Sequence, residues 1–84
     1  MGKYQQLLLT ILQGTSDANI GFNDRCHLLS RIGFEERIRG SHHLFRKSGV
    51  EEMLNLQRDG SKAKPYQVRQ VRTVLVRYKL EVED

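Results

Sequence analysis

The spacing of apolar residues changes at Gly33 in this 84-residue chain, and that change restricts the fold it can adopt. Before Gly33, apolar residues recur at helical spacing, which predicts two amphipathic helices, Lys3–Gln13 and Phe22–Ile32. Gly14 and Gly33 follow these segments as helix-ending residues. The first part of the chain is therefore predicted to be helical.

After Gly33, apolar and polar residues alternate as they do in half-buried strands. The pairs Gly40-Ser41 and Ser48-Gly49 interrupt the alternation and predict turns. The expected strands are Phe34–Arg39, His42–Lys47 and Val50–Gln57, the last with Leu54 and Leu56 on one face. Turns this short favour an antiparallel sheet.

A last helix is predicted to begin at Pro65, because proline is favoured at the first position of a helix. The polar segment Arg58–Lys64 is predicted to be the loop that leads into it. The buried stripe expected on this helix consists of Val68, Val71, Val74, Leu75 and Tyr78. The order helix, helix, three strands, helix predicts an α+β fold with helices packed on a three-stranded antiparallel sheet.

The length of the chain predicts one domain over residues 1–84, because it leaves no room for a second core. No apolar run approaches the roughly 18 residues of a membrane span, and the start lacks the layout of a secretion signal. The single cysteine, Cys26, cannot form an internal disulfide and excludes a cysteine-rich zinc site. A cytoplasmic protein without membrane contact is expected.

Basic residues are concentrated in the last third of the chain. Between Arg58 and Lys79 there are seven lysines and arginines against one acid, Asp59. Such a segment favours binding to a polyanion through counterion release. A solvated helix face explains the same charges equally well, so charge alone leaves both interpretations open.

His42 follows the Gly-Ser corner at the start of a predicted strand, and histidine exchanges protons near neutral pH. Because successive strand residues face opposite ways, His43 shares a face with Phe45, and His42 shares the other with Leu44. With Phe45 in the core, His43 is structural and His42 is the exposed candidate for proton transfer. If Leu44 lies in the core instead, the roles of His42 and His43 are exchanged.

These histidines also have other interpretations. A strand histidine is more often packed or hydrogen-bonded than catalytic, and His27 is expected at the surface. Metal binding is disfavoured, because adjacent strand residues diverge and no third ligand stands at a supporting spacing. Ser41 beside His42 does not by itself form a nucleophile and its base, because neighbours in sequence do not provide that geometry.

From about Phe22 to Leu80 the sequence resembles the HicA family of bacterial toxins, which are small ribonucleases that cleave messenger RNA. The motifs that carry the resemblance are Ile32-Gly33-Phe34, Gly40-Ser41-His42-His43 with Phe45, Leu54-Asn55-Leu56 and Gly60-Ser61-Lys62-Ala63-Lys64-Pro65. The resemblance implies a fold like the double-stranded-RNA-binding domain for residues 22–80. It also implies one catalytic histidine, His42, and neutralisation by a HicB-type antitoxin, often with a DNA-binding part.

Two features depart from that family. Residues 1–20 form an additional N-terminal helical extension. Many members carry a histidine shortly after the third strand, where this chain has Gln57-Arg58-Asp59. A mechanism that needs a second histidine there is not expected to operate in this chain.

The resulting hypothesis is a toxin that cleaves messenger RNA without a metal or cofactor. In it, His42 moves one proton while the RNA 2′-hydroxyl attacks its own phosphate. RNA contacts are assigned to Arg39, Ser41, Arg46, Lys62 and Lys64, although the charged residues can equally serve solubility. The chain is expected to be a monomer alone and part of a hetero-oligomer with its antitoxin.

Two other functions remain open at this point. One is an RNA-binding module of the same fold that cuts nothing and recognises RNA by its shape. The other is a chain that acts mainly as the antitoxin's partner at a promoter. Dependence on His42 separates the nuclease from both.

Overall fold

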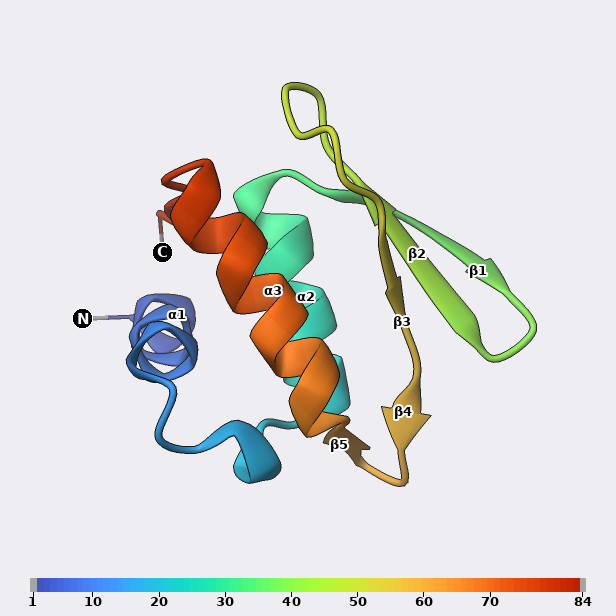
Figure 1. Ribbon diagram of the computed structural model, residues 1–84, viewed down its shortest axis with the longest axis horizontal. Helices are drawn as coiled ribbons and strands as arrows, with labels where there is room; N and C mark the ends of the chain where they lie inside the picture. Colours follow the sequence, from blue (N-terminus) through green and yellow to red (C-terminus); the bar gives the residue numbers. More distant parts are fainter. Residues whose placement is uncertain (1, 84) are drawn as a thin grey trace.

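The computed structural model describes residues 2–83, which fold into three α-helices, a three-stranded antiparallel sheet and a separate two-stranded hairpin (Figure 1). The elements are α1 (Lys3–Gln13), the 3₁₀ turn η1 (Asp17–Asn19), α2 (Phe22–Ile32), β1 (Glu35–Arg39), β2 (His42–Arg46), β3 (Leu54–Leu56), β4 (Arg58–Asp59), β5 (Lys62–Ala63) and α3 (Pro65–Arg77). The predicted α+β class and the order of its main elements are confirmed. None of the described helices is long and apolar enough to cross a membrane.

The helices begin and end where the local sequence allows it. Gly14 follows α1 in a left-handed conformation, with φ +74°, and its N–H donates to the carbonyl of Thr10. Pro65 is the first residue of α3, as predicted. The stripe expected on α3 is buried from Val68 to Leu75, whereas Tyr78 caps the helix and is only half-buried.

The elements form three layers. In Figure 1, α2 and α3 lie between the sheet and α1, and α1 packs against both of them. The N-terminal extension therefore stabilises the helical layer from the side opposite the sheet, with Leu8 and Ile11 in the common core.

The three strands have the order β1-β2-β3 and are antiparallel. The turn between β1 and β2 is Gly40-Ser41, and φ at Gly40 is +59°, a value that suits glycine at the first turn position of a hairpin. β1 is exposed at all five positions and lies at an edge of the sheet. Its Ile38 is 59% exposed, because the helices cover only part of the sheet.

The third strand is shorter than the predicted Val50–Gln57, and this prediction was wrong for residues 50–53. These residues are drawn toward the end of α3 instead of pairing with β2. The N–H of Glu51 donates to the hydroxyl of Tyr78, while the carboxylate of Glu52 accepts hydrogen bonds from Tyr78 and Arg77. Side-chain bonds to α3 thus take the place of a strand ladder.

The predicted loop Arg58–Lys64 also needs correction, because it contains the hairpin of β4 and β5 around Gly60-Ser61. This hairpin is tied to the segment before α2. The N–H of Ala63 donates to the carbonyl of Ile20 at 2.8 Å, and the N–H of Phe22 donates to the carbonyl of Ser61 at 3.0 Å. The chain between the sheet and α3 is therefore held in place by backbone hydrogen bonds.

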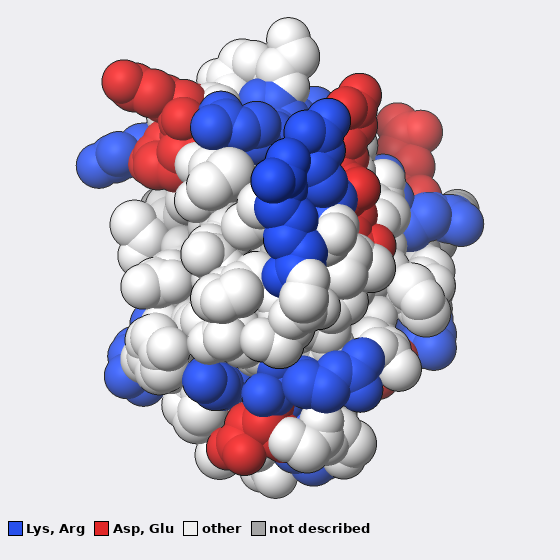
Figure 2. Space-filling model, turned by 90° about the vertical axis from the view of Figure 1, so that its right-hand side faces the viewer, with Lys and Arg blue, Asp and Glu red and all other residues white. Residues whose placement is uncertain are grey.

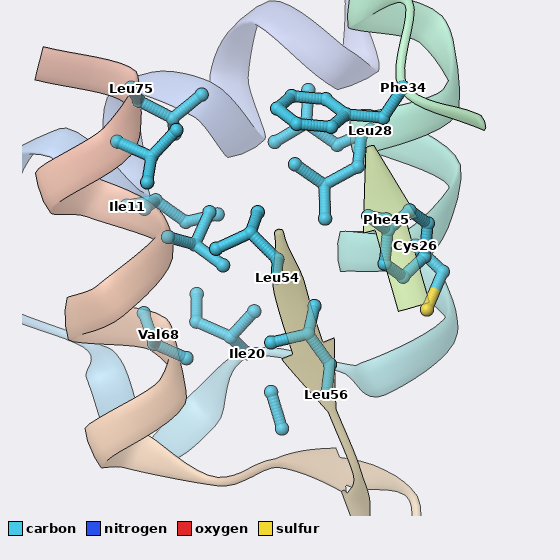
Figure 3. Close-up of a cluster of buried hydrophobic side chains, with 14 of the residues drawn as sticks. Ile11, Ile20, Cys26, Leu28, Phe34, Phe45, Leu54, Leu56, Val68 and Leu75 are labelled. Atoms are coloured by element: carbon cyan, nitrogen blue, oxygen red, sulfur yellow. The ribbon is translucent and has the colours of Figure 1, made fainter. Parts of the chain in front are cut away.

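The core lies between the helices and one face of the sheet (Figure 3). Phe45, Leu54 and Leu56 point into it from β2 and β3. The helices contribute Leu8, Ile11, Phe22, Cys26, Leu28, Leu29, Val68, Val71, Val74 and Leu75. Because Phe45 is fully buried, its replacement by alanine is expected to cost about 3–5 kcal/mol.

Candidate functional site

His42 begins β2 and is exposed on the sheet face that points away from the core, whereas its neighbour His43 is half-buried on the opposite face. The ring of His43 lies edge-on to Phe22, with ring centroids 4.8 Å apart. Phe45, on the same face as His43, is fully buried. The predicted assignment of the strand faces is therefore confirmed, and the inverse assignment with Leu44 inward is wrong.

Two side chains from the third strand and its end hold the His42 ring. Asn55 Oδ1 lies 2.9 Å from His42 Nδ1, and an amide oxygen only accepts, so Nδ1 carries the proton. The other ring nitrogen, Nε2, is then the one with a lone pair. Gln57 Nε2 lies 3.4 Å from it and donates to it. This arrangement selects the tautomer in which Nε2 can accept a proton.

Gln57 links the histidine to the rest of the site. Its Nε2 also donates to Ser41 Oγ at 3.4 Å, and its Oε1 accepts a hydrogen bond from Lys64 Nζ at 3.4 Å. A line of polar groups therefore runs from Lys64 through Gln57 to His42. Asn55 and Gln57 were not among the predicted site residues. Alternation along Leu54-Asn55-Leu56 places Asn55 on the same sheet face as His42, but the register that sets Asn55 opposite Leu44 comes from the fold.

A groove of about 590 Å³ adjoins His42 between β3 and α3. Beyond His42, Asn55 and Gln57, its walls include Met53, Tyr66, Gln70 and Thr73. Tyr66 is 48% exposed and Met53 is 41% exposed, so both offer apolar surface to a ligand. An aromatic ring beside a histidine is suited to stacking an unpaired nucleobase.

The predicted RNA-contacting residues are only partly gathered around His42. Ser41 and Lys64 belong to the hydrogen-bonded group, and Arg39 stands directly opposite His42 in the β1–β2 register. Arg46 is four residues further along β2, about 13 Å away at strand spacing. Lys62 pairs in register with Asp59 on the separate hairpin, and among residues 2–83 no hydrogen bond joins it to His42.

The outer sheet face carries further positive charge. Arg37 faces the same way as Arg39 and Arg46, because Arg37 lies opposite Leu44 and Arg39 opposite His42 in register. Figure 2 views the molecule from the side on which β1 and β4 lie, and shows lysines and arginines in groups with uncharged surface between them. A strand-borne row of arginines beside a histidine is suited to following a phosphate backbone.

The inner sheet face holds a second cluster, which the sequence analysis did not foresee. His43 Nδ1 lies 2.8 Å from Glu36 Oε2, and the ligand atoms of Cys26, Glu36 and His43 all lie within 4.8 Å of one another. Residue spacing gives no sign of this cluster, because Cys26 and Glu36 reach His43 only through the fold. Burial is the main cause that raises the pKa of the Cys26 thiol to about 11, and the Glu36 carboxylate adds to it.

Arg25 lies next to this cluster and is fully buried in α2. Within residues 2–83, none of its three guanidinium nitrogens has a hydrogen-bond partner. Its guanidinium stands over the ring of Phe22 at 5.3 Å, and Arg58 stands over the same ring at 4.8 Å. Burial lowers the pKa of Arg25 well below its usual value, to about 10.

Comparison with known protein families, with characterised proteins and with solved structures finds no match to this chain. The site is therefore interpreted from its own geometry.

Proposed function

We propose that this protein is a metal-independent endoribonuclease of the HicA toxin type, with His42 as its catalytic residue and messenger RNA as its substrate. The observation that carries the proposal is the His42–Asn55 hydrogen bond of 2.9 Å, which occupies Nδ1 and makes Nε2, on an exposed sheet face, the ring nitrogen available to accept a proton. A base held in this way is what removal of a proton from an RNA 2′-hydroxyl requires.

The reaction needs no group beyond the RNA and the protein. His42 Nε2 takes the proton of the 2′-hydroxyl, the 2′-oxygen attacks the adjacent phosphorus, and the bond to the 5′-oxygen breaks. The leaving oxygen takes a proton from water or from Lys64, which gives a 2′,3′-cyclic phosphate and a 5′-hydroxyl. Without RNA, the amide nitrogen of Gln57 lies 3.4 Å from His42 Nε2, and the substrate hydroxyl replaces it at that position. A positioned base contributes about 10²–10⁴-fold to such a step.

The surroundings of His42 support an RNA substrate. Arg39 and Lys64 bring positive charge to the phosphate as negative charge develops on it. The groove beside His42 offers Tyr66 for stacking against an unpaired base. Single-stranded messenger RNA fits this combination better than a duplex does, since its bases are free to stack on the protein.

The order of elements agrees with the proposed family. The run α2-β1-β2-β3-α3 has the order of a double-stranded-RNA-binding domain, and α1 and the β4–β5 hairpin are additions to it. In this proposal a HicB-type antitoxin covers the face that bears His42, in a hetero-oligomer formed in the cytoplasm.

The test is cleavage of a defined messenger RNA by purified wild type, His42→Ala and His27→Ala. His27 is exposed on α2 and controls for the loss of any histidine. We expect wild type and His27→Ala to give cyclic-phosphate ends in the presence of a chelator, and His42→Ala to be at least 100-fold slower with unchanged circular dichroism. Undiminished cleavage by folded His42→Ala would refute the assignment.

Growth arrest in a bacterial host extends the test to the toxin role. Induction of wild type should stop growth and deplete messenger RNA, whereas His42→Ala at equal soluble level should do neither. Arrest by both proteins would argue for binding without His42 chemistry.

A second candidate function, RNA binding without cleavage, is favoured by the arginines of the outer sheet face, which do not depend on His42. Arg37→Glu and Arg46→Glu would weaken RNA binding and reduce its salt dependence in either case. Binding that survives His42→Ala, together with no cleavage by wild type, would select this candidate.

A further inference from the structure

We infer that Cys26, Glu36 and His43 form a binding site for a divalent zinc-type ion on the inner face of the sheet, separate from the His42 site. The three residues come from three different elements, α2, β1 and β2, and are brought together only by the fold. His43 faces away from His42, so this site goes beyond the proposed ribonuclease function.

The donor set is one that zinc prefers. Zinc takes thiolate, imidazole and carboxylate ligands in tetrahedral geometry, with bonds of about 2.0–2.3 Å. Tetrahedral angles then place ligand atoms about 3.3–3.7 Å apart. In this protein the shortest pair, His43 Nδ1 and Glu36 Oε2, is 2.8 Å apart, and all three ligand atoms lie within 4.8 Å. Side-chain shifts of about 1 Å or less convert this spacing into a coordination shell.

Burial and charge suit the site. Cys26 is 6% exposed, and the side chains of His43 and Glu36 are 16% and 30% exposed, so the cluster is largely shielded and opens toward solvent at Glu36. A dication bound to one thiolate, one carboxylate and one neutral imidazole makes a complex of zero net charge. Because the ion brings two positive charges and the thiol proton leaves, the net charge of the cluster rises from −1 to zero, so Arg25 and Arg58 lie beside a neutral complex and not a cationic one.

Binding of the metal ion replaces existing bonds of the three residues. The Cys26 thiol releases its proton to solvent as sulfur binds the ion. The proton that His43 Nδ1 shares with Glu36 moves through solvent to Nε2 of the same ring, which frees the Nδ1 lone pair, and two metal–ligand bonds replace the hydrogen bond between Glu36 and His43. Water fills the fourth position, as it does in zinc sites with three protein ligands. The bound ion would connect α2 to β1, the exposed edge strand, through Cys26 and Glu36.

Cobalt(II) tests the site directly, because it takes zinc's place and reports a thiolate ligand by an intense charge-transfer band. The metal-free full chain is titrated with Co²⁺, and bound Co²⁺ is then displaced with Zn²⁺. We expect one equivalent to produce the charge-transfer band together with the visible bands of tetrahedral cobalt. Cys26→Ala should abolish the charge-transfer band, and His43→Asn should weaken binding at least tenfold.

His42→Asn is the matched control, since it removes the neighbouring histidine from the opposite strand face. We expect it to leave the spectrum and affinity unchanged. Glu36→Gln covers the case in which the other variants fail to fold, because its side chain is the most exposed of the three. It should weaken cobalt binding at least tenfold and reduce the zinc-dependent rise in melting temperature.

Three results would overturn the inference. They are no charge-transfer band with folded wild type, an equal band in Cys26→Ala, and cobalt binding that is lost in His42→Asn but kept in Glu36→Gln. None of them bears on whether RNA is cleaved, so the two proposals fail separately.

Discussion

Gln67 of α3 accepts a hydrogen bond from the backbone N–H of Gln57 at 2.9 Å, so a helix side chain stands where a fourth strand would pair. The same amide donates from Nε2 to the carbonyl of Asn55 at 3.3 Å. Gln67 is buried, with 5% of its surface exposed, and is one of two buried polar residues among those described. Its amide therefore joins α3 to the strand that positions the His42 partners.

Replacing Gln67 by leucine should destabilise the fold by about 2–4 kcal/mol, because two backbone groups lose their partners in a shielded place. Urea unfolding of the full chain measures this difference. Gln70→Leu, one turn further along the same helix and exposed, should change stability by less than about 0.5 kcal/mol. Equal effects from the two variants would show that the Gln67 bonds contribute little.

Asn55→Leu should change the tautomer of His42 without unfolding the protein. Asn55 is exposed, and its oxygen holds the proton on His42 Nδ1. Without it, the proton should move to Nε2, the form with no lone pair at the position proposed to face RNA. Nitrogen chemical shifts of the imidazole report the tautomer, and cleavage should slow about 10–100-fold. An unchanged tautomer with unchanged cleavage would contradict the role given to Asn55.

Arg25→Met should make the protein more stable, by about 1–3 kcal/mol, since it removes a buried charge without a hydrogen-bond partner. The pKa of Arg25 is lowered to about 10, so the charged form costs stability at every pH below that value, and the cost is relieved only as pH rises from 10 toward the usual pKa of an arginine. Urea unfolding near pH 7 is the measurement. Arg31→Met, on the exposed side of the same helix, should be within about 0.5 kcal/mol of wild type. A less stable Arg25→Met would show that the contact with Phe22 outweighs the burial of the charge.

The free energy of unfolding should fall in acid, because Glu52 loses its stabilising interactions when it is protonated. The hydrogen bond from Tyr78, assisted by Arg77, lowers the pKa of Glu52 below its usual 4.5. The unfolded chain therefore binds the proton first, and the stabilisation is complete above about pH 4.5 and is lost as pH falls through the lower folded value. The same bond raises the pKa of Tyr78, so stability should also decline as pH rises beyond 10.

The check is the urea midpoint of wild type and Glu52→Gln between pH 3 and pH 7. The variant should lose less stability than wild type over this range. Glu51→Gln alters the neighbouring carboxylate and should keep the wild-type pH profile. Parallel curves for wild type and Glu52→Gln would show that this carboxylate plays no part in acid unfolding.

Much of the fold was predictable, because helices are recognised in a sequence from the spacing of their apolar residues and from the residues at their ends. Lys3–Gln13 and Phe22–Ile32 were predicted to the residue, as was the start of α3 at Pro65. The short hairpin was missed because strands of two residues carry no alternation. Its turn, Gly60-Ser61, has the same Gly-Ser sequence as the Gly40-Ser41 turn of the first hairpin, with φ positive at both glycines. This repeated pair could have predicted the second hairpin.

The site was predictable to the extent that it lies on one strand. Alternation showed that His42 and His43 face opposite ways, and the expectation that the large Phe45 lies in the core selected His42 as the exposed one. Asn55 and Gln57 reach His42 through sheet register, and Cys26 reaches Glu36 through the packing of α2 on the sheet. Both kinds of proximity depend on the tertiary arrangement, which residue spacing does not encode.

The exposed edge strand β1 bears on the association of this protein with further copies of itself at high concentration. A strand with one unpaired edge and an exposed isoleucine is a template on which further copies can assemble. Its sequence, Glu-Glu-Arg-Ile-Arg, opposes such assembly. In-register stacking of identical strands would place glutamate against glutamate or arginine against arginine at four of the five positions of the strand. The charges of β1 thus disfavour fibril growth by like-charge repulsion, whatever else they bind.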